Sequence, residues 1–393
     1  MSLSSNGNSN KGLGKRFFSK AVQAQGSNET SDDDYRPCKI RRTSSSGITS
    51  LPDDCICNIY KCLRNRADRN SFGLTCHQWL HIQNTNEQSL WHGYPKIAST
   101  FCPESYPMVL CKLWTRFQHF KYLCLRGCPK VTDFVASKLL FSRSEVHTLD
   151  LDFCTEYSDI ELSSIFSWFP GLKDISLAET SITDIALEAL VKCCPSLEKV
   201  DLSWCKSITD SGISFLLRNC HKLGTLRINF CSNVTGSGFL GCPKTLTSVV
   251  ANRYYLKQEG INAMVSGGGL EHLRFSTSSE FADYEEESIN TEAVITISKG
   301  CPLLRELALQ NCDEVELEGW EAIGLNCKNL ESLDLFGASR SLCDLGLIAL
   351  SNGCDKLSEL SFCDDHRCSS SALELFKHER PNVDVIIKQY IDD

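Results

Sequence analysis

The 393-residue sequence lacks several features that would place it in common classes. It has no run of about eighteen apolar residues, which excludes a membrane-spanning helix. Its first residues are polar and contain no apolar core, so we expect no secretory signal. Basic residues are in deficit, with 40 against 49 acidic ones and a net charge of −9. Since phosphate backbones attract basic surfaces, we expect neither nucleic acid nor membrane among its partners.

Motifs for catalysis and metal binding are also missing. No nucleophile–base motif or phosphate-binding loop is present, so we predict no catalytic residue and no cofactor. The closest cysteine groups lack the paired C-x-x-C spacing of zinc sites, so we predict no metal. These groups are Cys55 with Cys57, Cys193 with Cys194, and Cys363 with Cys368.

Cysteine, by contrast, is abundant, with 23 residues. The number is odd, so complete pairing within one chain is impossible. Without a secretory signal, reduced thiols in the nucleus or cytoplasm, or both, are expected rather than disulfides.

Residues 1–47 are rich in Ser, Asn, Gly and Lys. They contain too little apolar surface to offset the entropy of ordering, which predicts a disordered tail. Basic residues at 15–16 and 39–42 match a nuclear import signal, although a plain solvated tail is the favoured alternative.

From residue 115 onward the pattern Leu-x-x-Leu-x-Leu recurs every 23 to 27 residues, with one interval of 34. Ten repeats in near-constant register predict an α/β solenoid, curved into a horseshoe, with residues 115–393 ending in a capping strand near Val383 and Val385. We call the middle apolar residue of each pattern the register position. The register positions are Leu123, Leu149, Ile175, Val200, Leu226, Val249, Leu273, Leu307, Leu333 and Leu360.

Each repeat predicts a strand, a turn and a helix. The register position and the residue two later face the same side of a short strand. A turn follows, often with Thr-Asp, as at Thr183-Asp184 and Thr209-Asp210, whose side chains can cap the next helix. Apolar spacings of 3, 4 and 7, as in Ile213, Leu216, Leu217 and Cys220, then predict the helix itself.

Ten cysteines occupy two fixed places in this repeat, five residues after and six before the register position. A compact, weakly polar side chain suits a buried filler at both places. Residues 115–390 resemble the cysteine-containing subclass of leucine-rich repeats.

Residues 48–92 precede the repeats, with 93–114 as an expected linker. Leu51-Pro52 opens a helix whose apolar stripe is Ile56, Ile59, Tyr60 and Leu63. A second amphipathic helix is expected to carry Phe72, Cys76, Trp79 and Leu80. The block resembles an F-box, with Gln78 where a basic residue is frequent. The matching residues are Leu51-Pro52-Asp53-Asp54, Ile59, Leu63, Asp68-Arg69, Leu74, Cys76 and Trp79.

Together the two resemblances identify an F-box/leucine-rich-repeat protein, most similar to plant members. The resemblance implies a non-catalytic substrate receptor: its F-box binds a Skp-type adaptor, and through it a cullin and a RING protein, while the repeats capture a protein for ubiquitination. It places the adaptor contacts at Leu51, Pro52, Ile59, Leu63, Leu74 and Trp79. Core packing is an equal alternative for Leu74 and Trp79.

An unknown protein substrate is expected on the strand face that does not enter the core. Charge changes sign along this face, and aromatic residues lie at the strand exits, as in binding hot spots. The alternative is a solvated face with scattered charges. The candidates are Asp150, Asp152, Asp174, Asp201, Arg227, Arg253, Arg274, Phe153, Trp204, Phe230, Tyr254 and Tyr255.

Two further points bear on function. An acidic insertion near residues 276–290 is expected to be a mobile loop, with gating of the strand face or phosphorylation as hypotheses. Plant hormone receptors combine an F-box with more repeats, so we predict no hormone or inositol phosphate here. The alternative to a ligase receptor is a repeat scaffold or inhibitor whose F-box-like block only caps the first repeat.

Overall fold

The computed structural model describes residues 48, 51–91, 106–117, 119–128, 145–252, 258–276, 289–310, 314–335, 341–364 and 366–388. Chain packing separates Met1–Leu51 from Pro52–Asp393, and the predicted tail lies outside the described residues. Within the described ranges, no helix is long and apolar enough to cross a membrane. The same ranges contain no group of three or more His, Cys, Asp or Glu side chains that could hold a metal ion.

The first described elements form a helical block of α1 (Asp53–Cys62), α2 (Arg66–Gly73) and α3 (His77–Asn86). Helix α1 begins after Pro52 and carries two aspartates in its first turn. Their negative charges are stabilising at the positive end of the helix dipole. Helix α2 begins at Asn65, whose side chain accepts a 2.9 Å hydrogen bond from the Ala67 N–H.

The prediction of a single second helix in this block was wrong. The chain turns between Gly73 and His77, so Phe72 lies on α2 and Trp79 lies on α3. The turn lets the two rings stack with centroids 4.4 Å apart. Packing of aromatic surface therefore overrides the helical periodicity read across residues 72–80.

The repeats form one parallel sheet of twelve strands in chain order, β1 to β12. The strands are β1 (Ser89–Trp91), β2 (Tyr122–Cys124), β3 (Thr148–Asp150), β4 (Asp174–Ser176), β5 (Lys199–Asp201), β6 (Thr225–Arg227), β7 (Ser248–Asn252), β8 (His272–Ser276), β9 (Glu306–Gln310), β10 (Ser332–Leu335), β11 (Glu359–Cys363) and β12 (Asp384–Lys388). Among the described strands, the sheet is open, since β1 and β12 are its two edges.

Strand pairing confirms the predicted register. Each of the ten register positions is the pairing partner of the next, from Leu123 on β2 to Leu360 on β11. Leu90 on β1 and Val385 on β12 extend the same column by one residue at each end. The predicted α/β leucine-rich-repeat solenoid is therefore confirmed.

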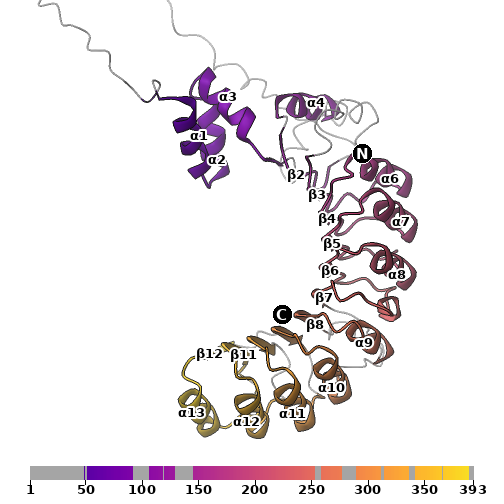
Figure 1. Cartoon of the computed structure of the whole chain (residues 1–393), viewed down its shortest axis with the longest axis vertical. Coiled ribbons are helices and arrows are strands. Elements are labelled where there is room, and N and C mark those ends of the chain that lie inside the picture. The colour runs from indigo at the N-terminus through magenta and orange to yellow at the C-terminus, as the bar shows by residue number, and fades with distance from the viewer. Residues whose placement is uncertain are drawn as a thin grey trace, which may run out of the picture. The chain divides into compact units, whose positions relative to one another are not determined.

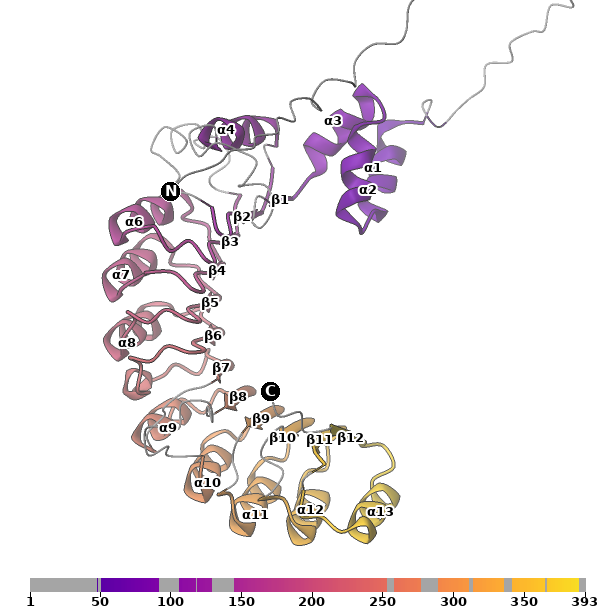
Figure 2. The same cartoon turned by 180° about the vertical axis from the view of Figure 1, so that it is seen from behind.

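Helices cover one face of the sheet and leave the other open, as both views show (Figures 1 and 2). The repeat helices are α4 (Tyr106–Arg116), α6 (Asp159–Trp168), α7 (Asp184–Cys193), α8 (Asp210–Asn219), α9 (Gln258–Val265), α10 (Thr291–Gly300), α11 (Leu317–Asn326), α12 (Asp344–Gly353) and α13 (Ser370–Glu379). The 23-residue repeat before β7 has room only for a 3-10 helix, η4 (Ser237–Phe239). The apolar register column packs against these helices as one continuous core. We call the uncovered side the open face.

The structure adds two elements around the expected linker. Strand β1 lies just before it and pairs with β2, while α4 lies across its end. The guanidinium of Arg116 on α4 donates hydrogen bonds of 2.7 and 3.1 Å to the side chains of Asn84 and Gln83 on α3. The domain boundaries at residues 92 and 114 stay a prediction.

The Thr-Asp turns have two separate tasks. Thr183 and Thr209 cap their own helices. The hydroxyl of each accepts a 3.2 Å hydrogen bond from the backbone N–H two residues later in the chain. Asp184 instead accepts from the backbone and hydroxyl of Thr209, one repeat later, at 2.9 and 2.5 Å. The threonine thus caps the start of a helix, and the aspartate links that helix to the next repeat by hydrogen bonds.

Asp210 forms a more extensive link of the same kind. Its carboxylate accepts hydrogen bonds from the backbone N–H groups of Thr235, Gly236 and Gly238 at 2.8, 3.0 and 2.8 Å. A side chain at Gly238 would place its Cβ only 2.5 Å from the Asp210 carbonyl oxygen, so the close approach requires glycine. Burial alone would raise the pKa of Asp210, but the hydrogen bonds from Thr235 and Gly238 outweigh it and lower the pKa below its usual value.

We predict that Asp210→Asn destabilises the protein by about 1 kcal/mol at pH 7. A carboxylate whose pKa is lowered by folding stabilises the native state above its unfolded pKa, near 4, and loses that effect as the pH falls through its folded pKa. The difference between variant and wild type should therefore shrink below pH 4 in urea titrations. Exposed Asp355→Asn serves as the control, and an undiminished difference at low pH would contradict the assignment.

The repeat cysteines are buried and bonded to the previous repeat. The thiols of Cys154, Cys205 and Cys231 donate to carbonyls of Leu125, Leu177 and Leu202 at 3.2, 3.1 and 3.0 Å. Burial raises the pKa of Cys154 and Cys231 to about 12, which keeps both as neutral thiols. They fill space, as the sequence predicted, and their hydrogen bonds also link successive repeats.

We predict that native protein at pH 8 reacts with iodoacetamide at the exposed Cys55 and Cys62 and not at Cys154, Cys205 or Cys231. Alkylation needs an accessible thiolate, which burial denies to the repeat cysteines. Mass spectrometry of tryptic peptides measures the modification, with urea-unfolded protein as the control. Equal labelling of Cys205 and Cys55 in native protein would show that the repeats open readily.

Candidate functional site

The helical block has a small core of its own. Ile56, Tyr60, Phe72 and Ile82 are at most 4% exposed, and the continuous solenoid core begins only at Leu90. The Tyr60 hydroxyl donates to Glu87, which also forms a 3.4 Å ion pair with Arg69. Three short helices are thus held by four apolar side chains and one polar cluster.

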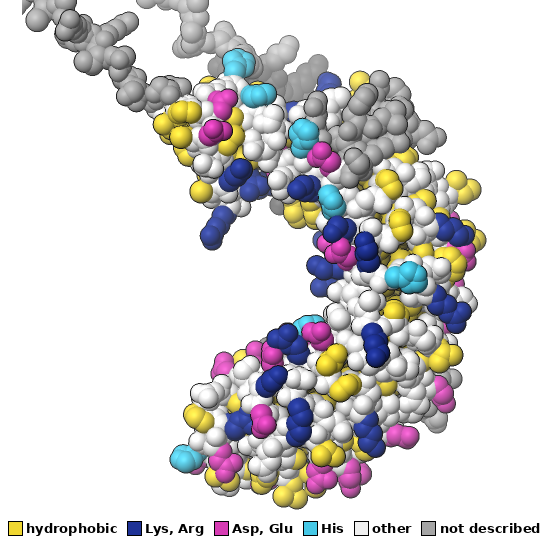
Figure 3. Space-filling view, in the orientation of Figure 1, with side chains coloured by type: hydrophobic (Ala, Val, Ile, Leu, Met, Phe, Trp, Pro, Cys, Tyr) yellow, Lys and Arg dark blue, Asp and Glu magenta, His cyan; other side chains and the backbone are white. Residues whose placement is uncertain are grey.

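The predicted adaptor residues divide into two groups by exposure. Leu74 is 86% exposed and Pro52 is exposed, whereas Leu51, Ile59 and Leu63 are half-buried. Trp79 stacks on Phe72, and its indole Nε1 is buried with no hydrogen-bond partner among the described residues. Packing therefore accounts for Trp79, whereas Leu74 stays outside the core of the block. Figure 3 shows hydrophobic side chains gathered on α1 and α2.

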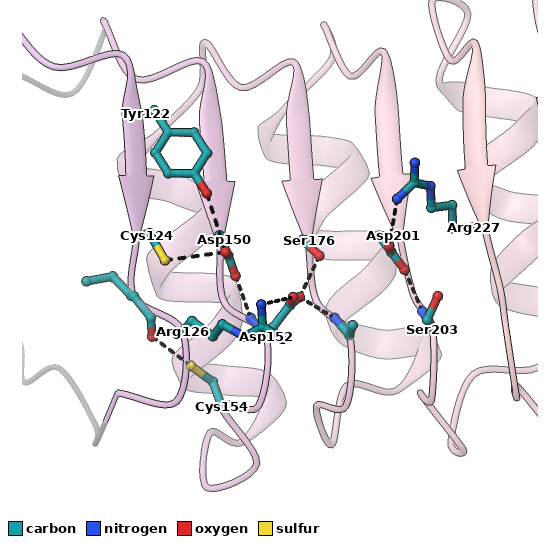
Figure 4. Close-up of polar contacts among 12 residues, drawn as sticks. Tyr122, Cys124, Arg126, Asp150, Asp152, Cys154, Ser176, Asp201, Ser203 and Arg227 are labelled. Carbon is teal, nitrogen blue, oxygen red and sulfur yellow. Dashed lines mark hydrogen bonds and ion pairs between the residues drawn. The ribbon is translucent and has the colours of Figure 1, made fainter. Parts of the chain in front are cut away.

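The first part of the open face carries a polar network on β2 to β4 (Figure 4). Tyr122 and Cys124 donate to one carboxylate oxygen of Asp150 at 3.4 and 3.3 Å, and the Asp152 N–H donates to the other at 3.1 Å. Ser176 and the Ala178 N–H donate to Asp152. Asp150 is only 9% exposed, so it serves this network.

Burial raises the pKa of Asp152, and the nearby Asp150 carboxylate adds to the effect, while the Ser176 hydroxyl opposes it. The Arg126 guanidinium lies 3.9 Å from the second Asp152 oxygen and compensates part of the charge. Two carboxylates are thus held close together by surrounding donors and one arginine.

Asp201 on β5 repeats the arrangement more openly. It accepts from the Ser203 N–H at 2.9 Å and lies 3.8 Å from the Arg227 guanidinium, as Figure 4 shows. The Arg227 side chain remains 56% exposed, whereas that of Asp201 is 21% exposed. Of this pair, the arginine is the group that a partner can reach.

The remaining predicted substrate residues vary in access. Asp174 on β4 is half-buried and Arg274 on β8 is exposed. Arg227, Arg274 and His272 border a hollow of about 220 Å³ on the open face, whose floor includes Val250. Arg253, Tyr254 and Tyr255, like the insertion at 277–288, lie outside the described residues.

Residues at the strand exits form what we call the exit column. Each member lies four residues after its register position, has φ between 57° and 66°, and donates its N–H to the next repeat. The members are Gly127, Phe153, Glu179, Trp204 and Phe230. Sequence reasoning selected the three aromatic members and missed Glu179, although its place in the register marks it.

Four members of the exit column are not glycine, which is unusual because a positive φ costs an L-residue about 1–2 kcal/mol. Phe153 and Trp204 are each 44% exposed. The ring of Trp204 stacks on that of Phe230 with centroids 3.7 Å apart, and the Arg126 guanidinium lies 4.6 Å from the Phe153 ring centre. Large side chains therefore stand on strained backbone at the edge of the open face.

We predict that Glu179→Gly stabilises the protein by roughly 0.5–1 kcal/mol, because relief of the positive φ exceeds the added entropy of the unfolded chain. Gly127→Ala, at the same place in the register, should destabilise it by about 1 kcal/mol. Urea denaturation measures both. A destabilised Glu179→Gly variant would show that this backbone conformation carries no strain.

Known proteins are similar to this chain in sequence or in fold. A family model described as "FBD-associated F-box protein At5g56370, LRR repeats" matches residues 116–210. F-box/LRR-repeat protein 12 of Arabidopsis thaliana is 44% identical over 293 residues, which are 73% of this chain and 72% of that protein. Rad7, solved in complex with Elc1 from yeast, is 18% identical with a TM-score of 0.46, covering 87% of this chain and 93% of that one. LegL7 from Legionella pneumophila, a leucine-rich-repeat protein, is 10% identical with a TM-score of 0.46, covering 82% and 97%.

The twelve parallel strands in constant register, with helices on one face, define a leucine-rich-repeat protein. The relationship to F-box/LRR-repeat protein 12 extends over most of both chains. This chain belongs to the F-box/LRR-repeat family of plants.

Proposed function

We propose that this chain is the substrate-recognition subunit of a cullin–RING ubiquitin ligase of the SCF type. In this proposal the helical block binds a Skp-type adaptor, which joins it to the cullin and RING proteins. The open face of the repeats holds the protein to be ubiquitinated. The chain itself contributes no chemistry, and it acts in the nucleus, the cytoplasm or both.

One observation carries the adaptor part of the proposal: Leu74 is 86% exposed in a block that already has a filled core. An exposed apolar side chain gains by burial against a partner, and Pro52 is exposed as well. Complete burial of a leucine contributes about 1.5–3 kcal/mol, enough to change an affinity by tenfold or more.

A second candidate function is a repeat scaffold in which the helical block is only a cap. It is favoured by the continuity of α3 into β1, which pairs with β2, and by the bonds from Arg116 to Asn84 and Gln83. Solenoids need their terminal repeats covered, so capping alone would explain these contacts. It gives the exposed Leu74 no role.

Co-expression of the full chain with a Skp-type adaptor, followed by size exclusion, separates the two candidates. We predict a stoichiometric complex that Leu51→Ala combined with Pro52→Ala disrupts. Leu74→Ala should weaken adaptor binding about tenfold or more without lowering the melting temperature. Trp79→Ala should instead destabilise the block itself by about 3 kcal/mol, because it removes a packed ring.

Leu325→Ala is the matched control, because Leu325 is 71% exposed on α11 and lies in the repeats. It should leave adaptor binding unchanged. A monodisperse chain that does not bind the adaptor would overturn the proposed function and leave the cap as the remaining role of α1–α3.

A further inference from the structure

We propose that the exit column holds an arginine side chain of a protein partner, inserted between the rings of Phe153 and Trp204 over the carboxylate of Glu179. The inference deepens the proposed function, on which it rests for the identity of the partner as a substrate. It assigns that partner a chemistry: an exposed, arginine-bearing segment.

The column has a ring on each side of Glu179, which has none, and we call the space over the Glu179 side chain the empty place. The Arg126 guanidinium lies over the Phe153 ring and comes from the repeat before it, on the side away from Glu179 in the column order. Phe230 stacks on Trp204 from the repeat after it, again on the side away from Glu179 in the column order. Both rings are 44% exposed.

The spacing fits a planar group. Phe153 and Trp204 lie two repeats apart on a parallel sheet, and neighbouring strands are about 4.8 Å apart, which separates their backbones by about 10 Å. A flat group stacked between two rings needs about 7 Å between the ring planes, since stacked planes lie about 3.5 Å apart, so a backbone separation of about 10 Å leaves room for one. A guanidinium meets this requirement, and the ammonium of lysine does not stack in this way.

Charge selects a cation for the empty place. Glu179 is exposed, and no described residue forms an ion pair or side-chain hydrogen bond with its carboxylate. The aromatic faces on both sides also attract cations. The chain already shows the same contact once, because Arg126 lies over the Phe153 ring and 3.9 Å from the Asp152 carboxylate.

The backbone conformation of the exit column indicates that its side chains have a role in binding as well as in folding. Glycine would satisfy the positive φ without strain, and Gly127 does so at the first position of the column. Phe153, Glu179 and Trp204 adopt the same φ with large side chains exposed. Strain of this kind is retained where the side chain has a use in binding.

The test is isothermal titration of the full chain with an acetylated, amidated heptapeptide that has arginine at alternate positions and glycine elsewhere. A second peptide replaces arginine by citrulline, which has the same planar shape without the charge. A third replaces it by lysine, which keeps the charge without the plane. The arginine peptide should bind at least tenfold more tightly than either of the others.

Variants locate the binding. Glu179→Gln and Trp204→Gly should each weaken the arginine peptide at least tenfold, and Trp204→Gly should keep the melting temperature near that of wild type, because strain is relieved as the stack is lost. Glu321→Gln on α11 is the charge-matched control, since the net charge of the chain attracts any basic peptide. It should leave the affinity unchanged.

Several outcomes would overturn the inference: equal binding of the citrulline peptide, no binding of the arginine peptide at millimolar concentration, or an equal effect of Glu179→Gln and Glu321→Gln. Adaptor binding is measured on the same variants. If the adaptor binds and the peptide does not, only the arginine site fails. If the peptide binds and the adaptor does not, the ligase role fails and the site remains.

Discussion

Parallel pairing of one short strand per repeat, in a constant register, is the constraint on which the rest of this structure depends. Because Leu123 pairs with Leu149, and each register position with the next, every other residue of a repeat lies beside its equivalent. Thr183 and Thr209 then cap the helices of two successive repeats, and Asp184 of the first accepts hydrogen bonds from Thr209 of the second. The buried thiols also link repeats, since Cys205 donates to the Leu177 carbonyl of the repeat before it.

The same regularity creates the candidate site. Every strand exit described between β2 and β6 turns through a positive φ, so the side chains there leave the sheet in the same direction. Variation at that one place, from Gly127 to Trp204, changes the surface without disturbing the core. A solenoid can thus vary its binding chemistry residue by residue while its fold stays fixed.

The helical block is stabilised by its own small core and not by a repeating register. It is too small to bury all its apolar residues, and its own core is filled by Ile56, Tyr60, Phe72 and Ile82. Trp79 joins that packing, while Leu74 is left outside it. The sequence pattern gave Leu74 and Trp79 the same expected roles. Their exposure depends on the turn at residues 74–76, and that turn is set by ring packing.

The solenoid, its register and the buried cysteines were determined by the sequence alone, because they follow from periodicity: the apolar pattern recurs in every repeat, and the cysteines keep the same two places in several. The exposure of individual polar residues was decided only by tertiary structure. Asp150 and Arg227 have the same place in the register, yet Asp150 is enclosed by Tyr122 and Cys124 of the neighbouring strand while Arg227 remains open to partners. Neighbours across strands, some 25 residues apart in the chain, set hydrogen bonding and burial, and no local pattern encodes which neighbour a side chain will meet.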